Sequence, residues 1–195
     1  MDYLHNSQYW KKGRLIGRGC FADVFLYHHV ETPLNIAVKQ VEFDPSVMEP
    51  ISEMEALKNE INLLANFSHS RIVKFLGSVM DKENYTLSVC LEYISGGSLF
   101  TLLQKGPLDL KTTVQYTQQL LEGVVYLHAN RVVHRDIKGK NVLLVDKGNL
   151  KLADFGISKQ LETLSSTHGA QTSVTGTIKW MAPEICSGKK IWHKG

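Results

Sequence analysis

The residues from 134 to 141, HRDIKGKN, place three side chains of different chemistry close together. A carboxylate (Asp136), an ammonium (Lys138) and an amide (Asn141) occur within six consecutive residues. Strand-like apolar runs at 131–133 and 142–145 flank them, which predicts a loop fixed at both ends, where catalytic side chains usually lie. Asp154, thirteen residues after Asn141, supplies a second carboxylate. One acid can take a proton from a hydroxyl group while the other oxygens bind magnesium, so these residues suit phosphoryl transfer.

The composition is that of an ordinary globular protein. The 195 residues are 43% hydrophobic and 21% charged, enough for one domain or two small lobes. No apolar run is long enough to span a membrane, the first residues lack a signal peptide's apolar core, and three separated cysteines give no disulfide framework. The lack of such a run predicts no membrane partner, and the scattered cysteines favour a reducing, cytoplasmic setting. The net charge of +3 is spread rather than clustered, so we expect no nucleic-acid partner.

Residues 10–29 alternate between apolar and polar positions, as in a β-hairpin. The turn of this hairpin contains Gly17 and Gly19. Glycines let a backbone approach phosphate groups closely enough for its N–H groups to donate hydrogen bonds. Taken alone, the pattern favours a plain hairpin turn over a phosphate-binding loop.

Lys39 lies inside an apolar strand predicted over 34–41. An unpaired buried ammonium is costly, so this lysine either extends to the surface from an edge strand or has an acidic partner. The segment 52–66 has apolar residues at helical spacing, and Glu60 lies beside that apolar stripe. Glu60 is therefore the candidate partner.

The periodicity changes along the chain. Two further strands are predicted at 73–80 and 85–93, and from Gly97 onward the period changes from two to about 3.6, which predicts helices over 98–105 and 108–130. The apolar, core-facing side predicted for the longer helix comprises Val114, Thr117, Leu120, Leu121, Val124, Val125 and Leu127.

The glycine turn, Lys39, the 134–141 loop and the sequence Asp154-Phe155-Gly156 together resemble the motifs of protein kinases. The resemblance implies an α+β, bilobal fold whose N-lobe is an antiparallel sheet plus one helix and whose C-lobe is mainly helical. The Asp-x-Lys form is typical of serine/threonine kinases. The segments HRDIKGKN, GTIKWMAPE and LEYISGGSL are most similar to the MAP kinase kinase kinases.

The resemblance also implies roles and two cofactors, ATP and magnesium. Asp136 would be the catalytic base, Lys138 would neutralise the transferring phosphate, and Asn141 and Asp154 would bind magnesium. Lys39 would contact the α- and β-phosphates and be oriented by Glu60. The ATP-binding residues would be Ile16, Gly17, Gly19, Val24, Ala37, Lys39, Leu91, Glu92, Tyr93 and Leu143. His134 is expected to hold the loop by hydrogen bonding.

Two features bear on regulation and on the glycine turn. The polar segment between Gly156 and the Ala-Pro-Glu sequence at 182–184 resembles an activation loop, with Ser173 and Thr175 as candidate phosphorylation sites. Arg135 would pair with a phosphate placed there. Ala22 stands where kinases have the third glycine of the turn, and alanine disfavours a positive φ.

The resemblance divides the chain into an extension (1–9), an N-lobe (10–92), a partial C-lobe (93–186) and an atypical tail (187–195). Kinases continue through further helices, so we expect an incomplete C-lobe and a partly uncovered apolar side on the 108–130 helix. Two functions remain open. One is ATP-dependent serine/threonine phosphorylation of protein substrates, with a MAP kinase kinase as one candidate. The other is a catalytically inactive nucleotide-binding or regulatory fragment. The oligomeric state is not predicted.

Overall fold

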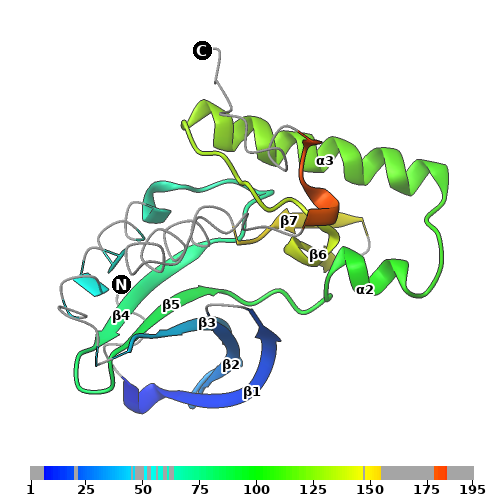
Figure 1. Ribbon diagram of the computed structural model, residues 1–195. Coiled ribbons are helices and arrows are strands. Elements are labelled where there is room, and N and C mark those ends of the chain that lie inside the picture. Colours follow the sequence, from blue (N-terminus) through cyan, green and yellow to red (C-terminus); the bar gives the residue numbers. More distant parts are fainter. Residues whose placement is uncertain are drawn as a thin grey trace. The chain divides into compact units, whose positions relative to one another are not determined.

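The computed structural model describes residues 7–19, 22–44, 46, 51, 54–55, 57–58, 61, 64–146, 148–154 and 178–183. They belong to two compact units, Met1–Ser95 and Gly96–Gly195, both drawn in Figure 1. The first unit is built on a β-sheet, and the second on helices and a small β-hairpin. None of the described helices combines the length and the apolar character needed to cross a bilayer.

A five-stranded antiparallel sheet in the order β1-β2-β3-β5-β4 forms the first unit. Its strands are β1 (Trp10–Arg18), β2 (Asp23–His29), β3 (Asn35–Glu42), β4 (Phe75–Asp81) and β5 (Thr86–Glu92), preceded by the 3₁₀ turn η1 (Ser7–Tyr9). The hairpin predicted at 10–29 and the three later strands are confirmed, with each strand end within two residues of its predicted position.

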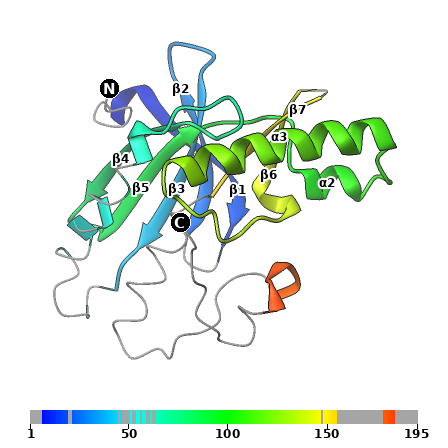
Figure 2. The ribbon, with the colours of Figure 1, turned by 90° about the horizontal axis from the view of Figure 1, so that it is seen from above.

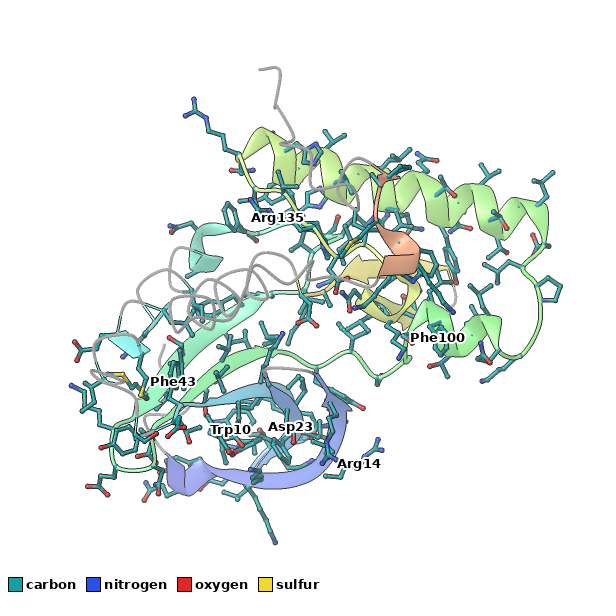
Figure 3. All side chains as sticks on the ribbon, viewed as in Figure 1. Trp10, Arg14, Asp23, Phe43, Phe100 and Arg135 are labelled. Carbon is teal, nitrogen blue, oxygen red and sulfur yellow. The ribbon has the colours of Figure 1, made fainter. Side chains whose placement is uncertain are left out.

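The two faces of this sheet carry different side chains because successive residues of a strand point to opposite sides. On one face Ile36, Val38 and Cys90 form a buried cluster, and Trp10 packs against it inside the curl of β1 to β3 (Figure 3). The apolar stripe predicted for 52–66 is also present, because Met54, Leu57 and Ile61 are helical and at most 1% exposed. The 3₁₀ turn η2 (Leu64–Asn66) follows this stripe.

The second unit contains helices at the predicted positions. They are α2 (Leu99–Leu103) and α3 (Leu110–Ala129), followed by the 3₁₀ turn η3 (Gly139–Asn141), the hairpin strands β6 (Val142–Asp146) and β7 (Asn149–Leu152), and the turn η4 (Ile178–Trp180). Side chains cap both helices, since Ser98 accepts the amide of Thr101 and Asp109 accepts the amide of Thr112. The long helix α3 lies along the β6–β7 hairpin in both views (Figures 1 and 2).

The buried side of α3 is largely not the one that the sequence predicts. Its buried residues are Tyr116, Gln119, Gly123 and Leu127, so Leu127 alone of the predicted set is fully buried. The predicted core residues Val114, Thr117, Leu121 and Val125 are exposed, as expected for a partly uncovered apolar side but not for core residues. α3 carries apolar residues on two sides, and the side that packs against the hairpin is the one with Gln119, whose side chain hydrogen-bonds to it. Hydrophobic periodicity contains no information about those bonds.

The strand predicted at 131–133 is also wrong. The amide of Arg131 donates to the carbonyl of His128 and that of Val132 to Leu127, both at 2.9 Å, so these residues extend the end of α3. Arg131 has a φ of 60° there, in the left-handed region where many helices end. The 134–141 loop is therefore reached from the C-terminus of a helix and leads into strand β6.

Candidate active site

The carboxylate of Asp136 is held by two other residues of its own loop. Its Oδ2 lies 2.6 Å from the Nζ of Lys138 and accepts a hydrogen bond from the Nδ2 of Asn141 at 2.9 Å. The same Nδ2 also donates to the backbone carbonyl of Asp136 at 2.8 Å. The Asp136 and Lys138 side chains are 19% and 20% exposed, so the carboxylate is oriented but still reachable by a hydroxyl group.

A tight turn produces this arrangement. The amide of Asn141 donates to the carbonyl of Lys138 at 2.9 Å, which closes η3 and turns the buried Asn141 side chain back toward Asp136. Arg135, on the loop that follows α3 (Figure 3), has a φ of 68°. Such conformations cost about 1–3 kcal/mol in non-glycine residues and are found most often at functional sites.

His134 supports the loop from inside. The residue is 4% exposed, and its Nδ1 accepts a hydrogen bond from the backbone amide of Asp136 at 3.4 Å, which is the hydrogen-bonding role expected from the sequence. Burial lowers the pKa of His134, while the nearby carbonyls of His134 and Ala153 and the carboxylates of Asp136 and Asp154 act in the opposite direction. The imidazole is therefore biased toward its neutral form, and both acids lie close enough to influence it.

Asp154 is brought to this loop by the β6–β7 hairpin. Asn141 immediately precedes β6, and Asp154 comes two residues after β7 ends. The amide of Ala153 donates to the carbonyl of Asn141 at 2.8 Å, so the two ends of the hairpin are tied together. Asp154 has a φ of 60°, which turns it away from the direction of the strand.

These two residues fit a magnesium ion. Because the Nδ2 of Asn141 donates to Asp136, its amide oxygen is the atom left for a cation. Magnesium typically takes one or two protein carboxylates and completes its shell with water and substrate phosphates. Among the described residues there is no group of three or more His, Cys, Asp or Glu side chains that could hold a metal ion.

The hairpin is held against α3 by a residue that the sequence analysis missed. Gln119, 5% exposed, donates from Nε2 to the carbonyl of Gly148 at 2.6 Å and accepts the amide of Leu150 at 3.0 Å. Gln115 donates to the same Gly148 carbonyl at 2.9 Å. The available signal was a helix face with Tyr116, Gln119, Gly123 and Leu127 at helical spacing, in which a polar residue lies among buried positions.

In the first unit, the strand register places four of the predicted ATP-binding residues on one face of the sheet. Lys39 pairs with Val24, and Ala37 pairs with Leu91. Ala37 and Lys39 are two residues apart on β3, so their side chains point to the same face. Lys39 is 7% exposed and lies in an inner strand rather than at an edge, which rules out the edge-strand alternative. Its predicted partner, Glu60, lies outside the described residues.

The turn after β1 is narrow. Gly17 pairs with Val24, and the amide of Gly19 donates to the carbonyl of Ala22 at 2.9 Å. Ala22, which replaces the third glycine, is buried. Ile16 lies at a register shift between β1 and β2.

The remaining predicted ATP-binding residues lie in two places. Glu92 ends β5, where its carboxylate accepts the amide of Lys74 at 2.6 Å, and the half-buried Tyr93 follows it. Leu143 belongs to the second unit, in β6, where it pairs with Lys151 and forms a bridge with Ser98. Several predicted residues lie outside the described part of the chain: Glu60, Phe155, Gly156, Ser173 and Thr175.

Comparison with known proteins decides the family, because residues 10–194 match the protein kinase domain. The chain belongs to the protein kinase family. The family confirms the predicted fold, an antiparallel sheet followed by a mainly helical part, and implies the use of ATP and a divalent metal ion. The matched range includes 187–194, for which the sequence alone indicates no kinase counterpart.

The relatives of this kinase chain include several MAP kinase kinase kinases, which confirms the predicted resemblance. This chain is 46% identical over 186 residues to human mitogen-activated protein kinase kinase kinase 3, and the alignment covers 95% of this chain and 30% of that protein. It is 44% identical over 180 residues to mitogen-activated protein kinase kinase kinase ANP1 of Arabidopsis thaliana, covering 90% of this chain and 27% of that protein. The chain thus spans less than a third of these relatives.

Proposed function

We propose that this chain catalyses the ATP-dependent phosphorylation of serine or threonine residues in protein substrates, as part of a MAP kinase cascade. The observation that carries the proposal is the loop in which Lys138 and Asn141 both hold one oxygen of Asp136. A carboxylate fixed in this way can orient a hydroxyl group and accept its proton, which is the requirement for transferring a phosphoryl group to a side chain.

Each side chain of the loop has a distinct task in this proposal. Asp136 accepts the proton of the attacking hydroxyl, and the Lys138 ammonium neutralises charge on the transferring phosphate. Asn141 and Asp154 hold magnesium, which supplies electrostatic stabilisation of the phosphates when bound. Lys39 binds the α- and β-phosphates, oriented by Glu60.

Adenine binding is assigned to the residues predicted from the sequence. The backbone near Gly17 and Gly19 covers the phosphates, and the base contacts Ile16, Val24, Ala37, Leu91, Glu92, Tyr93 and Leu143. The alignment of Val24, Ala37 and Leu91 on one sheet face supports this assignment. We assign residues 10–92 to the N-lobe and 93–186 to the C-lobe.

The cascade position rests on the names of the relatives, so the proposed substrate is a MAP kinase kinase in the cytoplasm. Ser173 and Thr175 are the proposed regulatory phosphorylation sites, and Arg135, which is exposed, is the proposed partner of the added phosphate. Alanine at both positions should abolish activation by phosphorylation without altering nucleotide binding.

One observation favours the second candidate, an inactive nucleotide-binding or regulatory fragment. The outer side of α3 exposes Leu110, Val114, Leu121 and Val125 at 58–80%. An apolar stripe of this kind destabilises a chain in water or indicates a surface that another protein segment covers.

Phosphate incorporation separates the two candidates. The full chain is incubated with labelled ATP and magnesium and with one basic and one acidic generic protein, beside the Asp136→Asn variant. Loss of the carboxylate base should lower the rate by about 10²- to 10⁴-fold. Equal phosphate incorporation by the parent chain and the Asp136→Asn variant would rule out the enzymatic proposal. Before the assay, a cooperative melting curve measured by circular dichroism establishes that the parent chain and the variant are both folded.

A further inference from the structure

Lys140 and Phe100 form an exposed cation–aromatic pair next to the catalytic loop. Lys140 belongs to η3, between Lys138 and Asn141, and its Nζ lies 5.3 Å from the centroid of the Phe100 ring. Phe100, on α2 (Figure 3), is 42% exposed, and Lys140 is also exposed. The proposed mechanism gives neither side chain a task.

Close backbone packing fixes this pair. A Cβ added to Gly139 would lie 3.3 Å from the backbone nitrogen and 3.4 Å from the Cα of Phe100, so the start of α2 rests directly on η3. Because glycine permits this approach, the ring and the ammonium are carried by two touching backbone segments. Their relative position therefore does not depend on long, mobile side chains alone.

The two chain segments that carry the pair are rich in cationic residues and poor in acids. Residues 93–108, which include α2, contain no aspartate or glutamate. The segment 131–141 contains four cationic side chains, those of Arg131, Arg135, Lys138 and Lys140, and one carboxylate, that of Asp136, which Lys138 already contacts. These two segments therefore carry more positive than negative charge, and the exposed Lys140 ammonium favours anionic groups.

We propose that Lys140 and Phe100 select protein substrates that carry an acidic side chain close to the phosphorylated serine or threonine. This inference rests on the proposed function, since it names the substrate class of the same site. Lys140 and Asp136 are four residues apart, so their Cα atoms are separated by at most about 14 Å. An extended substrate whose hydroxyl meets Asp136 therefore places residues within about four positions of the acceptor near the Lys140 ammonium.

The expected effect is modest because Lys140 is exposed. Exposed ion pairs are weak and salt-sensitive. We therefore expect the chain to bind an acidic peptide about two- to five-fold more tightly than a neutral one at low salt. The Phe100 ring stabilises the ammonium and offers its face to the substrate chain, so Phe100→Leu should weaken peptide binding regardless of peptide charge.

Peptide binding tests the inference without requiring catalysis. Fluorescein-labelled peptides with one serine, flanked at two to four residues by glutamate, glutamine or lysine, are titrated with the full chain and followed by anisotropy at low and high salt. The unmodified chain and Lys140→Arg should bind the glutamate peptide two- to five-fold more tightly than the glutamine peptide. Lys140→Gln should lose this preference, and Lys140→Glu should favour the lysine peptide.

The matched control is Lys111→Gln, which removes another exposed lysine, in the first turn of α3. It should keep the glutamate preference. If Lys140→Gln keeps the preference, or Lys111→Gln loses it to the same degree, the inference is wrong. Asp136→Asn distinguishes failure of this inference from failure of the proposed function, because it should strongly slow phosphate transfer while the glutamate preference persists.

Discussion

Gln119 should be the polar residue on which the packing of the catalytic hairpin against α3 depends most. Replacing it with leucine keeps the volume but removes both of its hydrogen bonds to the hairpin. The amide of Leu150, a residue with no exposed surface, would then lose its acceptor, which costs about 1–3 kcal/mol. The Gly148 carbonyl would keep its hydrogen bond from Gln115, so losing the bond from Gln119 should cost only about 0.5–1.5 kcal/mol. The predicted total is about 1.5–4.5 kcal/mol.

Urea unfolding, followed by far-UV circular dichroism, measures this loss, and hydrogen exchange at the Leu150 amide locates it. Gln115→Leu is the control, because it removes only the shared donor to Gly148 and should cost less than about 1.5 kcal/mol. The hairpin also ties Asn141 to Ala153, so Gln119→Leu should weaken magnesium-dependent ATP binding. Surface substitutions usually change the free energy of unfolding by less than about 0.5 kcal/mol. A change as small as this for Gln119→Leu would refute the reasoning.

Three further predictions concern single residues of the second unit. Gly96→Ala should destabilise the fold by about 1–3 kcal/mol in urea titration, because a Cβ there would collide with the carbonyl oxygen of Leu144. The amide of Leu144 donates to the carbonyl of Gly97, so the collision would also disturb that hydrogen bond. An unchanged urea midpoint would contradict the close approach. Burial lowers the pKa of His134 from 6.5, so the stability from its neutral ring is present above pH 6.5 and is lost as the pH falls toward the folded value. His134→Gln should flatten that acid limb in thermal melts, and an unaltered slope would argue against a neutral ring. The backbone and hydroxyl hydrogen bonds from Thr112 lower the pKa of Asp109 below 3.8, so its capping contribution is present above pH 3.8 and is lost at lower pH. Asp109→Asn, which retains a capping side chain, should reduce the pH dependence of helix content below pH 4, and identical titrations would show that the cap is not ionic.

The fold was predictable where local patterns and motifs are strong. Alternation located β1 and β2, the apolar run at 34–41 located the inner strand that carries Lys39, and helical spacing located Met54, Leu57 and Ile61. The grouping of Asp136, Lys138 and Asn141 was also predictable, because a loop of six residues brings its own side chains together whatever surrounds it.

The packing of α3 was not predictable in the same way. Two apolar stripes on one helix offer two packing sides, and the choice depends on Gln119 meeting a strand about thirty residues further along the chain. The region 131–133 failed for a related reason, since its apolar residues continue the hydrogen bonding of a helix end instead of pairing with a strand. Short apolar runs carry no signal that distinguishes these outcomes.

The central claim is that Lys39, from the first unit, and Asp136, from the second, serve one phosphoryl transfer. Rates of phosphate incorporation for Lys39→Met, Asp136→Asn and the double variant test it directly. Residues that act in one reaction are strongly non-additive, so the double variant should be about as slow as the slower single variant. A Lys39→Met or Asp136→Asn variant that retains the parent rate, or a double variant whose loss is the full product of the two single losses, would contradict the account.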